Sequence, residues 1–418
     1  MFLVASVASN AFGSFMPAAP GKPDPQRVRW KGRTITIAVS NSVLEPNSNI
    51  KMDSDVVGAL RRSALAWQSV ADIEIQIEPT DRQSVSPSGG IGDGVSLITI
   101  AQTPENVLLF SRRDPQAESA WTRVFYSGRG FITEADIVLN PFQQFSTDGT
   151  FGTFDLESTL THEIGHFLGL RHSEVLGSTM SDSLAKNGTF GLTEDAARSL
   201  ADSDIAAIRD LYGVDGENEV CCAAITGRLA TGSPKAVREL KVWAEDSSTG
   251  RVLAQVDAAS DGSFRLGGLS SGSYSVFWQK EGDPSPSTVG GLGTFRLEKG
   301  ETRIINEKIS LDRSDVELRY VGINNQLTNS AITLGSGREY TVYLGGKNLD
   351  HKRIAVEFNS PYLTVVPNTL AEQDFGEGIS VISFVVAVHA DTTAGIYSIF
   401  TTVGDGSLSS LIGALNVQ

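Results

Sequence analysis

The chain has 418 residues, a length that suggests about three domains rather than one hydrophobic core. Hydrophobic residues make up 40% of the sequence and charged residues 20%, which is typical of globular proteins. The formal net charge of −15 argues against nucleic acid as a partner, because an acidic surface repels a phosphate backbone. The sequence contains no apolar stretch long enough to predict a membrane span.

The amino-terminal segment is interpreted as signal-like. Residues 1–11 are apolar and small and end in a tolerable cleavage site, but the first basic residue is Lys22, so a basic n-region is missing. We interpret residues 1–26 as a signal-like segment followed by a linker rich in proline and glycine, and we predict an exported protein. A start further upstream and a disordered tail are the alternatives.

Strand and helix patterns alternate through residues 27–218. Residues 34–39 alternate at period two, as a half-buried strand does, whereas residues 53–70 carry an apolar stripe at helical spacing. A helix is expected over residues 156–168 and another over 202–212, and each is followed by a glycine. Further strands are expected at residues 73–77, 95–101, 121–126 and 131–139. The pattern predicts an α+β domain in which helices pack on a twisted, mixed sheet.

The residue pattern of the sequence changes after residue 220. Helical periodicity disappears, and short strand patterns separated by Gly, Ser and Asp take over. Several short strands at such spacing are typical of β-sandwiches. We predict two all-β sandwich domains, one over residues 219–312 and one over residues 313–418.

The two cysteines, Cys221 and Cys222, are adjacent and cannot cross-link distant parts of the chain. The favoured interpretation is two small packed side chains at a domain junction. A local disulfide between neighbours or an intermolecular disulfide is the alternative. Neither thiol is predicted to be catalytic.

Three of the five histidines fall within eleven residues, namely His162, His166 and His172. The first two are spaced i and i+4, so a helix places both imidazoles on one face, within reach of one ion. Gly169 lets the chain leave the helix and bring His172 to the same ion. Three neutral ligands leave a fourth position open, which is typical of a catalytic rather than a structural zinc.

Glu163 is adjacent to the first predicted ligand and therefore points beside the metal. Zinc lowers the pKa of a bound water, and Glu163 is placed to accept a proton as the water attacks a peptide carbonyl. The same carboxyl can then pass the proton to the leaving amine. The sequence thus predicts a zinc-dependent endopeptidase acting on proteins or peptides. The alternative is that the pattern of His162, Glu163 and His166 occurs by chance on a helix without binding a metal. Gly169 and His172 argue against this alternative, because both occur at the required spacing.

The motif HExxHxxGxxH of residues 162–172 resembles that of the metzincin clan, and Ser173 after the third histidine is similar to the matrixin branch. The resemblance covers residues 27–215. It implies a metzincin catalytic fold with one catalytic zinc. Met180 lies at the spacing of the matrixin Met-turn, which implies a methionine packed beneath the metal site as structural support, alongside Gly169.

Residues 135–140 resemble the edge strand along which substrates of this family lie extended. The resemblance implies that Ile137, Val138 and Leu139 bind the substrate through β-augmentation, in which main-chain hydrogen bonds add a strand to a sheet. Met180 is followed here by serine and aspartate rather than by tyrosine or proline. The family's preference at the S1′ pocket therefore does not carry over.

The sequence also departs from the family in its other ligands. No histidine precedes His162 and no cysteine precedes the domain, so neither a second, structural zinc nor latency through a cysteine is expected. Calcium sites are compatible with four aspartates in glycine-containing or loop-like surroundings, although solvated loop aspartates are the commoner explanation. These aspartates are Asp93, Asp136, Asp148 and Asp155.

The carboxy-terminal half resembles two kinds of accessory module. Residues 223–311 are similar to the carboxypeptidase-regulatory-like, prealbumin-like sandwich of exported bacterial proteins, and residues 313–418 resemble an immunoglobulin-like sandwich. The resemblance implies a bacterial protein that is secreted, periplasmic or on the cell surface. The modules either bind a surface or polymer or serve as an inert stalk. The competing hypothesis for the whole chain is a surface adhesion or matrix-binding protein with a non-catalytic metallo-domain.

Overall fold

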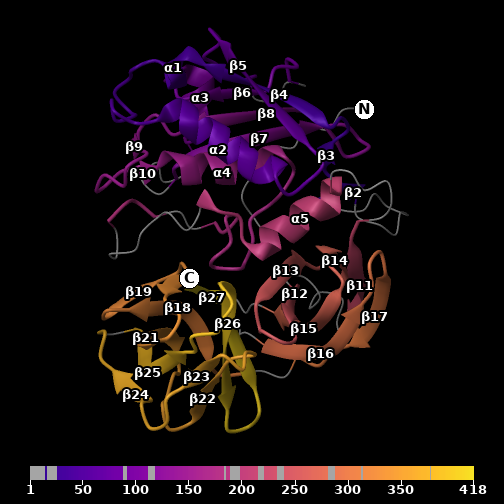
Figure 1. Ribbon diagram of the computed structural model, residues 1–418, viewed down its shortest axis with the longest axis vertical. Helices are drawn as coiled ribbons and strands as arrows, with labels where there is room; N and C mark the ends of the chain where they lie inside the picture. Colours follow the sequence, from indigo (N-terminus) through magenta and orange to yellow (C-terminus); the bar gives the residue numbers. More distant parts are fainter. Residues whose placement is uncertain are drawn as a thin grey trace. The chain divides into compact units, whose positions relative to one another are not determined.

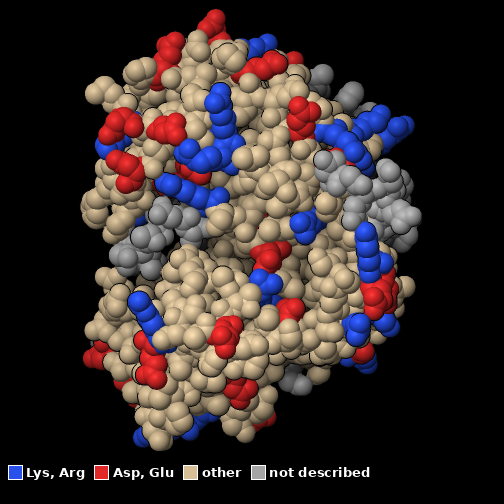
Figure 2. Space-filling view, in the orientation of Figure 1, with Lys and Arg blue, Asp and Glu red and all other residues tan. Residues whose placement is uncertain are grey.

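The computed structural model describes most of the chain, and the signal-like residues 1–11 lie outside the described part. The described residues are 15–16, 26–87, 92–111, 118–182, 185–188, 198–214, 221–232, 240–280, 288–311, 314–376 and 378–418. Within them, no helix is both long and apolar enough to cross a bilayer. On the face shown in Figure 2, Lys and Arg side chains are interspersed with Asp and Glu, and no broad basic area is visible among the described residues.

The chain divides into two compact units whose boundaries differ from the predicted domains. The first unit comprises Met1–His172, Leu184–Leu200 and Leu211–Asn218. The second comprises Ser173–Ser183, Ala201–Asp210 and Glu219–Gln418. The residues that directly follow His172 therefore group with the β-rich half, although residues 27–218 were predicted to form one domain.

The first unit contains a six-stranded sheet in the order β3-β8-β6-β4-β5, with β7 paired to β8 (Figure 1). All pairings are parallel except that between β7 and β8. The strands are β3 (Arg29–Trp30), β4 (Thr34–Ser40), β5 (Glu74–Thr80), β6 (Leu97–Thr99), β7 (Ala120–Tyr126) and β8 (Phe131–Leu139). Two short pairs are β1 (Phe15–Met16) with β2 (Gln26–Arg27), and β9 (Phe145–Ser146) with β10 (Phe154–Asp155).

In the first unit, helix α2 packs against α4, the helix that carries His162 and His166. The described helices of the chain are α1 (Asn41–Leu44), α2 (Val56–Gln68), α3 (Pro104–Leu108), α4 (Leu156–Phe167) and α5 (Asp202–Tyr212), of which α5 has the predicted bounds and is divided between the two units. The buried Trp67 of α2 donates its indole N–H to the carbonyl of Thr161 at 2.9 Å. Ser63 donates its hydroxyl to the carbonyl of Glu157 at 3.0 Å. Helix α4 also contacts β7 and β8.

The predicted substrate strand is wrong, because β8 lies inside the sheet rather than at its edge. β7 pairs with β8 along one side, while β6 pairs with Ile137 and Val138 on the other. The side chains of Ile137, Val138 and Leu139 are all 0% exposed, so none of them is available to a substrate. The antiparallel edge strand is β7.

The second unit contains two sandwiches, each built from two sheets (Figure 1). The sheets of the first are β14-β11-β17 and β13-β12-β15-β16, which enclose a core that includes Leu229, Leu240 and Leu266. Its strands are β11 (Ala223–Ala230), β12 (Leu240–Asp246), β13 (Val252–Asp257), β14 (Ser263–Leu269), β15 (Gly272–Lys280), β16 (Thr288–Leu297) and β17 (Thr302–Lys308).

The second sandwich joins the sheet β19-β18-β21-β25-β23, with β24 also paired to β25, to the sheet β20-β27-β26-β22. Its core includes Phe384, Tyr397 and Leu415, each at most 1% exposed. Its strands are β18 (Glu317–Ile323), β19 (Gln326–Thr328), β20 (Ile332–Leu334), β21 (Arg338–Lys347), β22 (Ile354–Glu357), β23 (Leu363–Val365), β24 (Ala371–Gln373), β25 (Ser380–Val388), β26 (Gly395–Val403) and β27 (Leu408–Val417).

Aromatic rings and a buried carboxyl join the two sandwiches within the second unit. Phe277 of β15 lies 5.2 Å, centroid to centroid, from both Trp243 of β12 and Phe400 of β26. Glu245, which is 0% exposed, accepts hydrogen bonds from the indole of Trp243 at 2.9 Å and from Asn359 at 3.0 Å. Because Asn359 belongs to the second sandwich, these hydrogen bonds connect the two sandwiches within the second unit.

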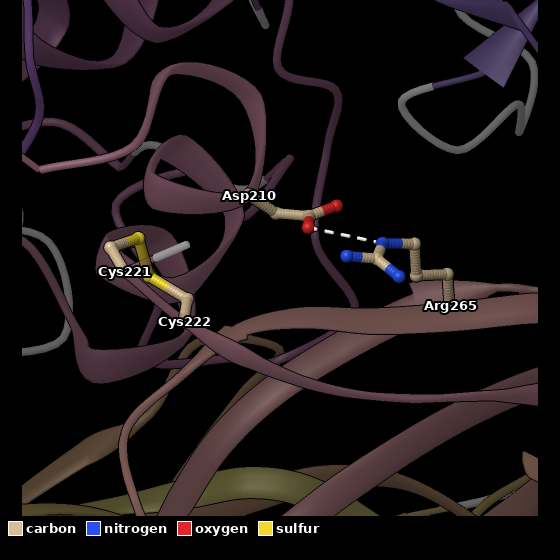
Figure 3. The surroundings of a disulfide bond; sticks show 4 residues. All are labelled: Asp210, Cys221, Cys222 and Arg265. Carbon is tan, nitrogen blue, oxygen red and sulfur yellow. Dashed lines mark hydrogen bonds and ion pairs between the residues drawn. A yellow bond between two sulfur atoms is a disulfide. The ribbon is translucent and has the colours of Figure 1, made fainter. Parts of the chain in front are cut away.

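Cys221 and Cys222 form a disulfide with each other (Figure 3). Of the alternatives left by the sequence, the local bridge is therefore present, and the favoured pair of packed free thiols is wrong. Close to the disulfide, Arg265 of β14 donates to the carboxylate of Asp210 at 3.1 Å. This ion pair fastens the second-unit part of α5 to the first sandwich.

Candidate metal and catalytic site

Asp155 caps the start of helix α4. The Asp155 carboxylate accepts the backbone N–H of Ser158 at 2.8 Å, which satisfies one of the unpaired donors of the first turn. The same carboxyl is 1% exposed and pairs with Arg198, whose Nε lies 3.0 Å from Oδ1. The start of the histidine helix is thereby fixed by both a cap and an ion pair.

The other end of α4 closes in a turn that only glycine fits well. Gly169 donates to the carbonyl of His166, and Leu170 donates to that of Gly165, each at 2.9 Å, which is the double bond of a Schellman turn. Gly169 has φ +99°, and a Cβ there would lie 2.2 Å from the carbonyl oxygen of Val28. Positive φ and lack of space both require glycine, so the predicted role of Gly169 in ending the helix is confirmed.

Two residues distant in sequence satisfy the last carbonyls of α4. Trp30 donates its indole N–H to the carbonyl of Phe167 at 2.8 Å, and Tyr212 donates its hydroxyl to that of Leu168 at 2.6 Å. Tyr212 also accepts the backbone N–H of Trp30 at 3.0 Å. Carbonyls at a helix end have no partner within the helix, so these contacts stabilise the turn that leads to His172.

The three histidines come together in a cluster that could hold a metal ion. One ring nitrogen from each of His162, His166 and His172 lies within 4.8 Å of the other two. The ring centroids of His166 lie 4.7 Å from those of both His162 and His172. His162 is buried and His172 exposed, so the cluster opens towards solvent at its third member. Three imidazoles are a common donor set for zinc.

A backbone contact fixes the ring of His166. Its Nδ1 lies 2.9 Å from the carbonyl of Leu170, and since a carbonyl only accepts, Nδ1 carries the hydrogen. The lone pair of Nε2 is then available to a metal. Burial, followed by the neighbouring His162 and His172, lowers the pKa of His166 well below its ordinary value, which keeps the ring neutral as a ligand must be.

Glu163 is buried and hydrogen-bonded to a residue that the sequence did not indicate. The hydroxyl of Thr122, in β7, donates to Glu163 Oε2. Burial raises the pKa of Glu163 to about 7, the Thr122 hydroxyl opposes this shift, and the charge of Glu118 adds to it. A carboxyl in this range is matched to proton transfer near neutral pH. Thr122 reaches the helix only through folding, so no local spacing points to it.

Met180 lies in a tight turn that belongs to the second unit. Its side chain is 2% exposed, and its carbonyl accepts the backbone N–H of Ser173 at 2.7 Å. Asp204 of α5 accepts the N–H of Thr179 at 2.8 Å and the hydroxyl of Ser178 at 2.5 Å. The turn is thus ordered by Asp204, while the place of Met180 beneath the metal stays a prediction.

Each aspartate considered for calcium pairs with a cationic side chain. The bonded pairs are Arg82 with Asp93, Arg123 with Asp136, Lys51 with Asp148 and Arg198 with Asp155. A cation beside each carboxylate competes with calcium. The commoner explanation, solvated loop aspartates, is also incomplete, because Asp136 and Asp155 are buried.

Residues 114–213 match the sequence model of the matrixin family. The chain carries a matrixin-like metallopeptidase domain. Metalloendoproteinase 1 of Glycine max is 44% identical over 193 residues, which cover 45% of this chain and 53% of that protein. Metalloendoproteinase 1-MMP of Arabidopsis thaliana is 29% identical over 206 residues, covering 46% of this chain and 45% of the relative. The chain thus spans about half the length of these curated relatives of its matrixin-like domain.

Solved structures resemble the chain only weakly. The major pilin subunit BcpA of Bacillus cereus is 11% identical, with a TM-score of 0.18, over 45% of this chain and 66% of that one. The protein SGBP-B of a Bacteroides ovatus mixed-linkage glucan utilization locus is 12% identical, with a TM-score of 0.16, over 46% and 42% of the chains. Likeness this weak says nothing about what the sandwiches attached to the matrixin-like domain do.

Proposed function

We propose that the protein is a zinc-dependent endopeptidase. The observation that carries the proposal is the buried carboxyl of Glu163 beside the cluster of His162, His166 and His172. The three imidazoles would hold one zinc ion, which supplies Lewis-acid polarisation of a peptide carbonyl and of water. The neutral state of His166 and the fixed hydrogen on its Nδ1 support this donor set.

Glu163 acts in this proposal as the general base and then as the general acid. Its Oε2 is held by Thr122, so Oε1 is the oxygen on which we place the transferred proton. The carboxylate accepts a proton from the attacking water and delivers it to the nitrogen of the leaving amine. The exposed side of the cluster, at His172, gives an extended peptide access to these groups.

We propose that the substrate adds beside β7, which replaces the strand expected from the sequence. Among the described strands, β7 pairs only with β8, so its other edge carries the main-chain groups that β-augmentation needs. β7 also supplies Thr122, which links the proposed substrate strand to the proposed base. Calcium does not enter this proposal.

The test compares Glu163→Gln with the wild-type chain for zinc content and for hydrolysis of casein. Zinc near one per chain in both proteins, with activity lost only in Glu163→Gln, is the expected result. Glu45→Gln, at an exposed carboxyl of the first unit, is the control and should keep full activity. Full activity in Glu163→Gln would refute the assigned base, and absence of zinc from the wild type would refute the metal.

We also propose that the protein acts outside the cytoplasm. The apolar composition of residues 1–11 and the disulfide between Cys221 and Cys222 support export, because disulfides persist in oxidising compartments. Fractionation of the source cells tests this. A bacterial source, binding of the sandwiches to a surface or polymer, and the alternative of an adhesion protein without catalysis stay predictions that no contact of the described residues favours.

A further inference from the structure

One side of the edge strand β7 faces the histidine helix α4, against which the strand packs. Side chains alternate along a strand, so Tyr126 lies on the same side as Thr122, whose hydroxyl reaches Glu163. The guanidinium carbon of Arg123 lies 4.8 Å from the ring centroid of Phe125, and both belong to the opposite side. The extra residue of the bulge near the end of the pairing belongs to β8, so the alternation in β7 continues to Tyr126.

The segment that leaves α4 brings an arginine beside Tyr126. Arg171 directly precedes His172, and the side chains of Arg171 and Tyr126 are both half-buried. Burial raises the pKa of the Tyr126 phenol, and the positive charge of Arg171 opposes this shift, so the two groups are close enough to interact electrostatically. A phenol O–H and a guanidinium are both hydrogen-bond donors. Together they form a site suited to a carboxylate.

Two further arginines add positive charge at the same end of β7. Arg129 is exposed in the turn that joins β7 to β8. Arg29 of β3 lies over the ring of Phe131 at 5.6 Å, and its backbone N–H donates to the carbonyl of Gly130 at 3.0 Å. Neither arginine forms an ion pair with a carboxylate among the described residues. Since the whole chain carries a net charge of −15, this end of β7 is a local exception.

The other end of β7 carries the opposite charge. Glu118 is half-buried just before the strand begins at Ala120, and its carbonyl accepts a hydrogen bond from Asn140 at 2.7 Å. Its negative charge adds to the effect of burial in raising the pKa of Glu163, so the Glu118 carboxylate lies near the proposed base. A peptide that runs beside β7 therefore passes from a negative to a positive environment.

We propose that the preferred substrates carry an acidic side chain where the peptide passes Tyr126 and Arg171. The inference rests on the proposed function, because it concerns the peptide that adds beside β7. Tyr126 and Arg171 donate hydrogen bonds to the carboxylate, and the two other arginines attract it. Thr122, which marks the position of the base, is four positions from Tyr126, a distance of about 13 Å in a strand. The acidic residue is accordingly expected roughly two to five residues from the scissile bond, on one side only.

The charges along β7 also determine which peptides are disfavoured. An acidic side chain on the other side of the scissile bond would lie near Glu118 and be repelled. Moving one negative charge along the peptide therefore changes its effect from favourable to unfavourable. This behaviour differs from a general attraction of anions to a cationic surface, which does not depend on where the charge lies.

The experiment uses the full chain and peptides of equal length in which one glutamate is moved stepwise along a neutral sequence. Hydrolysis gives kcat and KM for each peptide, and fluorescence anisotropy gives its binding to the Glu163→Gln variant. Tyr126→Phe removes only the hydroxyl, and Arg171→Gln removes the charge. Arg33→Gln is the matched control, because Arg33 belongs to the same unit, is 74% exposed and pairs with Asp72. Zinc content is measured for every variant.

We expect kcat/KM and binding to be about fivefold better with glutamate than with glutamine on the favoured side, mostly through KM. Glutamate on the other side should weaken both, and high salt should reduce the preference. The preference should fall in Tyr126→Phe, disappear in Arg171→Gln and persist in Arg33→Gln. If Arg171→Gln does not fold or loses zinc, Tyr126→Phe and Arg129→Gln decide, because neither residue is adjacent to a histidine.

Equal kcat/KM and binding at every glutamate position, with casein still hydrolysed, would overturn the inference and leave the peptidase proposal intact. A wild-type preference in folded Tyr126→Phe and Arg129→Gln would overturn it as well. A wild-type chain that hydrolyses neither casein nor any peptide would instead overturn the proposed function. The anisotropy measurement would then still show whether the chain favours acidic peptides.

Discussion

Thr122 donates its hydroxyl to the carboxylate of Glu163 and so joins the edge strand β7 to the histidine helix α4. Both residues are buried, Thr122 at 6% and Glu163 at 4% exposure. The bond holds one carboxylate oxygen in place and leaves the other for proton transfer. Thr122 is therefore a positioning residue for the proposed base.

Replacing Thr122 by valine, which has nearly the same shape, should lower kcat. A hydrogen bond to a charged group is worth about 1.5–3 kcal/mol, which corresponds to a loss of roughly 10- to 100-fold if it is needed in the transition state. KM should change less than kcat, because the hydroxyl faces Glu163 and not the substrate. Thr122→Ser keeps the hydroxyl and should keep most of the activity, and equal rates for both variants would contradict the role.

Gly169→Ala should destabilise the turn after α4 and reduce zinc retention. The positive φ costs an L-residue about 1–2 kcal/mol, and the carbonyl of Val28 leaves no room for a Cβ. Gly149→Ala separates the two effects, since Gly149 has φ +74° but nothing within 4 Å of the added Cβ. Urea unfolding and zinc analysis of both variants are the measurements, and a larger loss at Gly149 would count against the clash.

Asp155→Ala should be strongly destabilising. It removes the cap of α4 and leaves Arg198 beside a site where the carboxylate was 1% exposed. Breaking such a buried pair typically costs about 3–5 kcal/mol. Asp53→Ala is the control, because Asp53 is 72% exposed and an exposed ion pair such as that with Lys51 contributes little to stability. Denaturant midpoints of the two variants test the difference, and similar midpoints would refute it.

The buried carboxyl of Glu245 should make the stability of the second unit depend on pH. Burial raises its pKa from 4.5 to about 7, and its hydrogen-bond partners Trp243, Asn359 and Ser398 are uncharged. Between these values the folded chain keeps a proton that the unfolded chain releases. Stability therefore falls as pH rises from about 4.5 to 7, by up to about 1.4 kcal/mol per pH unit.

Glu245→Gln should remove this pH dependence, since the amide does not titrate. As pH rises between the two pKa values of Glu245, the unfolding free energy of Glu245→Gln should increase relative to that of the wild type. Glu298→Gln, at a side chain that is 72% exposed, is the control and should follow the wild type. If the unfolding free energies of Glu245→Gln and the wild type vary with pH in parallel, Glu245 is not the source of the pH dependence.

Local spacing explains which parts of the site could be predicted. His162 and His166 are one helical turn apart, and Gly169 closes the helix, so the ligand cluster follows from short-range geometry. Thr122 joins the site only through strand pairing and packing, which no local pattern records. The partition of residues 173–183 into the second unit likewise depends on contacts with strands far along the chain.

The wrong substrate strand had a signal in the sequence. Residues 135–139 are almost continuously apolar around one aspartate, as is typical of a strand buried on both faces of a parallel sheet. β7 places Thr122 and Arg123 between apolar residues, which better suits an edge. The resemblance to a family motif assigned the edge position to β8, whereas β7, the preceding strand in the chain, occupies the edge.

The bridge between Cys221 and Cys222 has a consequence for how the chain acquires its covalent structure. These are the only two cysteines, and both sulfurs are used in a bond between neighbours. Within one molecule, oxidation therefore has a single product, and there is no mispaired isomer for a disulfide isomerase to correct. The oxidised chain also presents no thiol that could compete with the three clustered histidines for a metal ion.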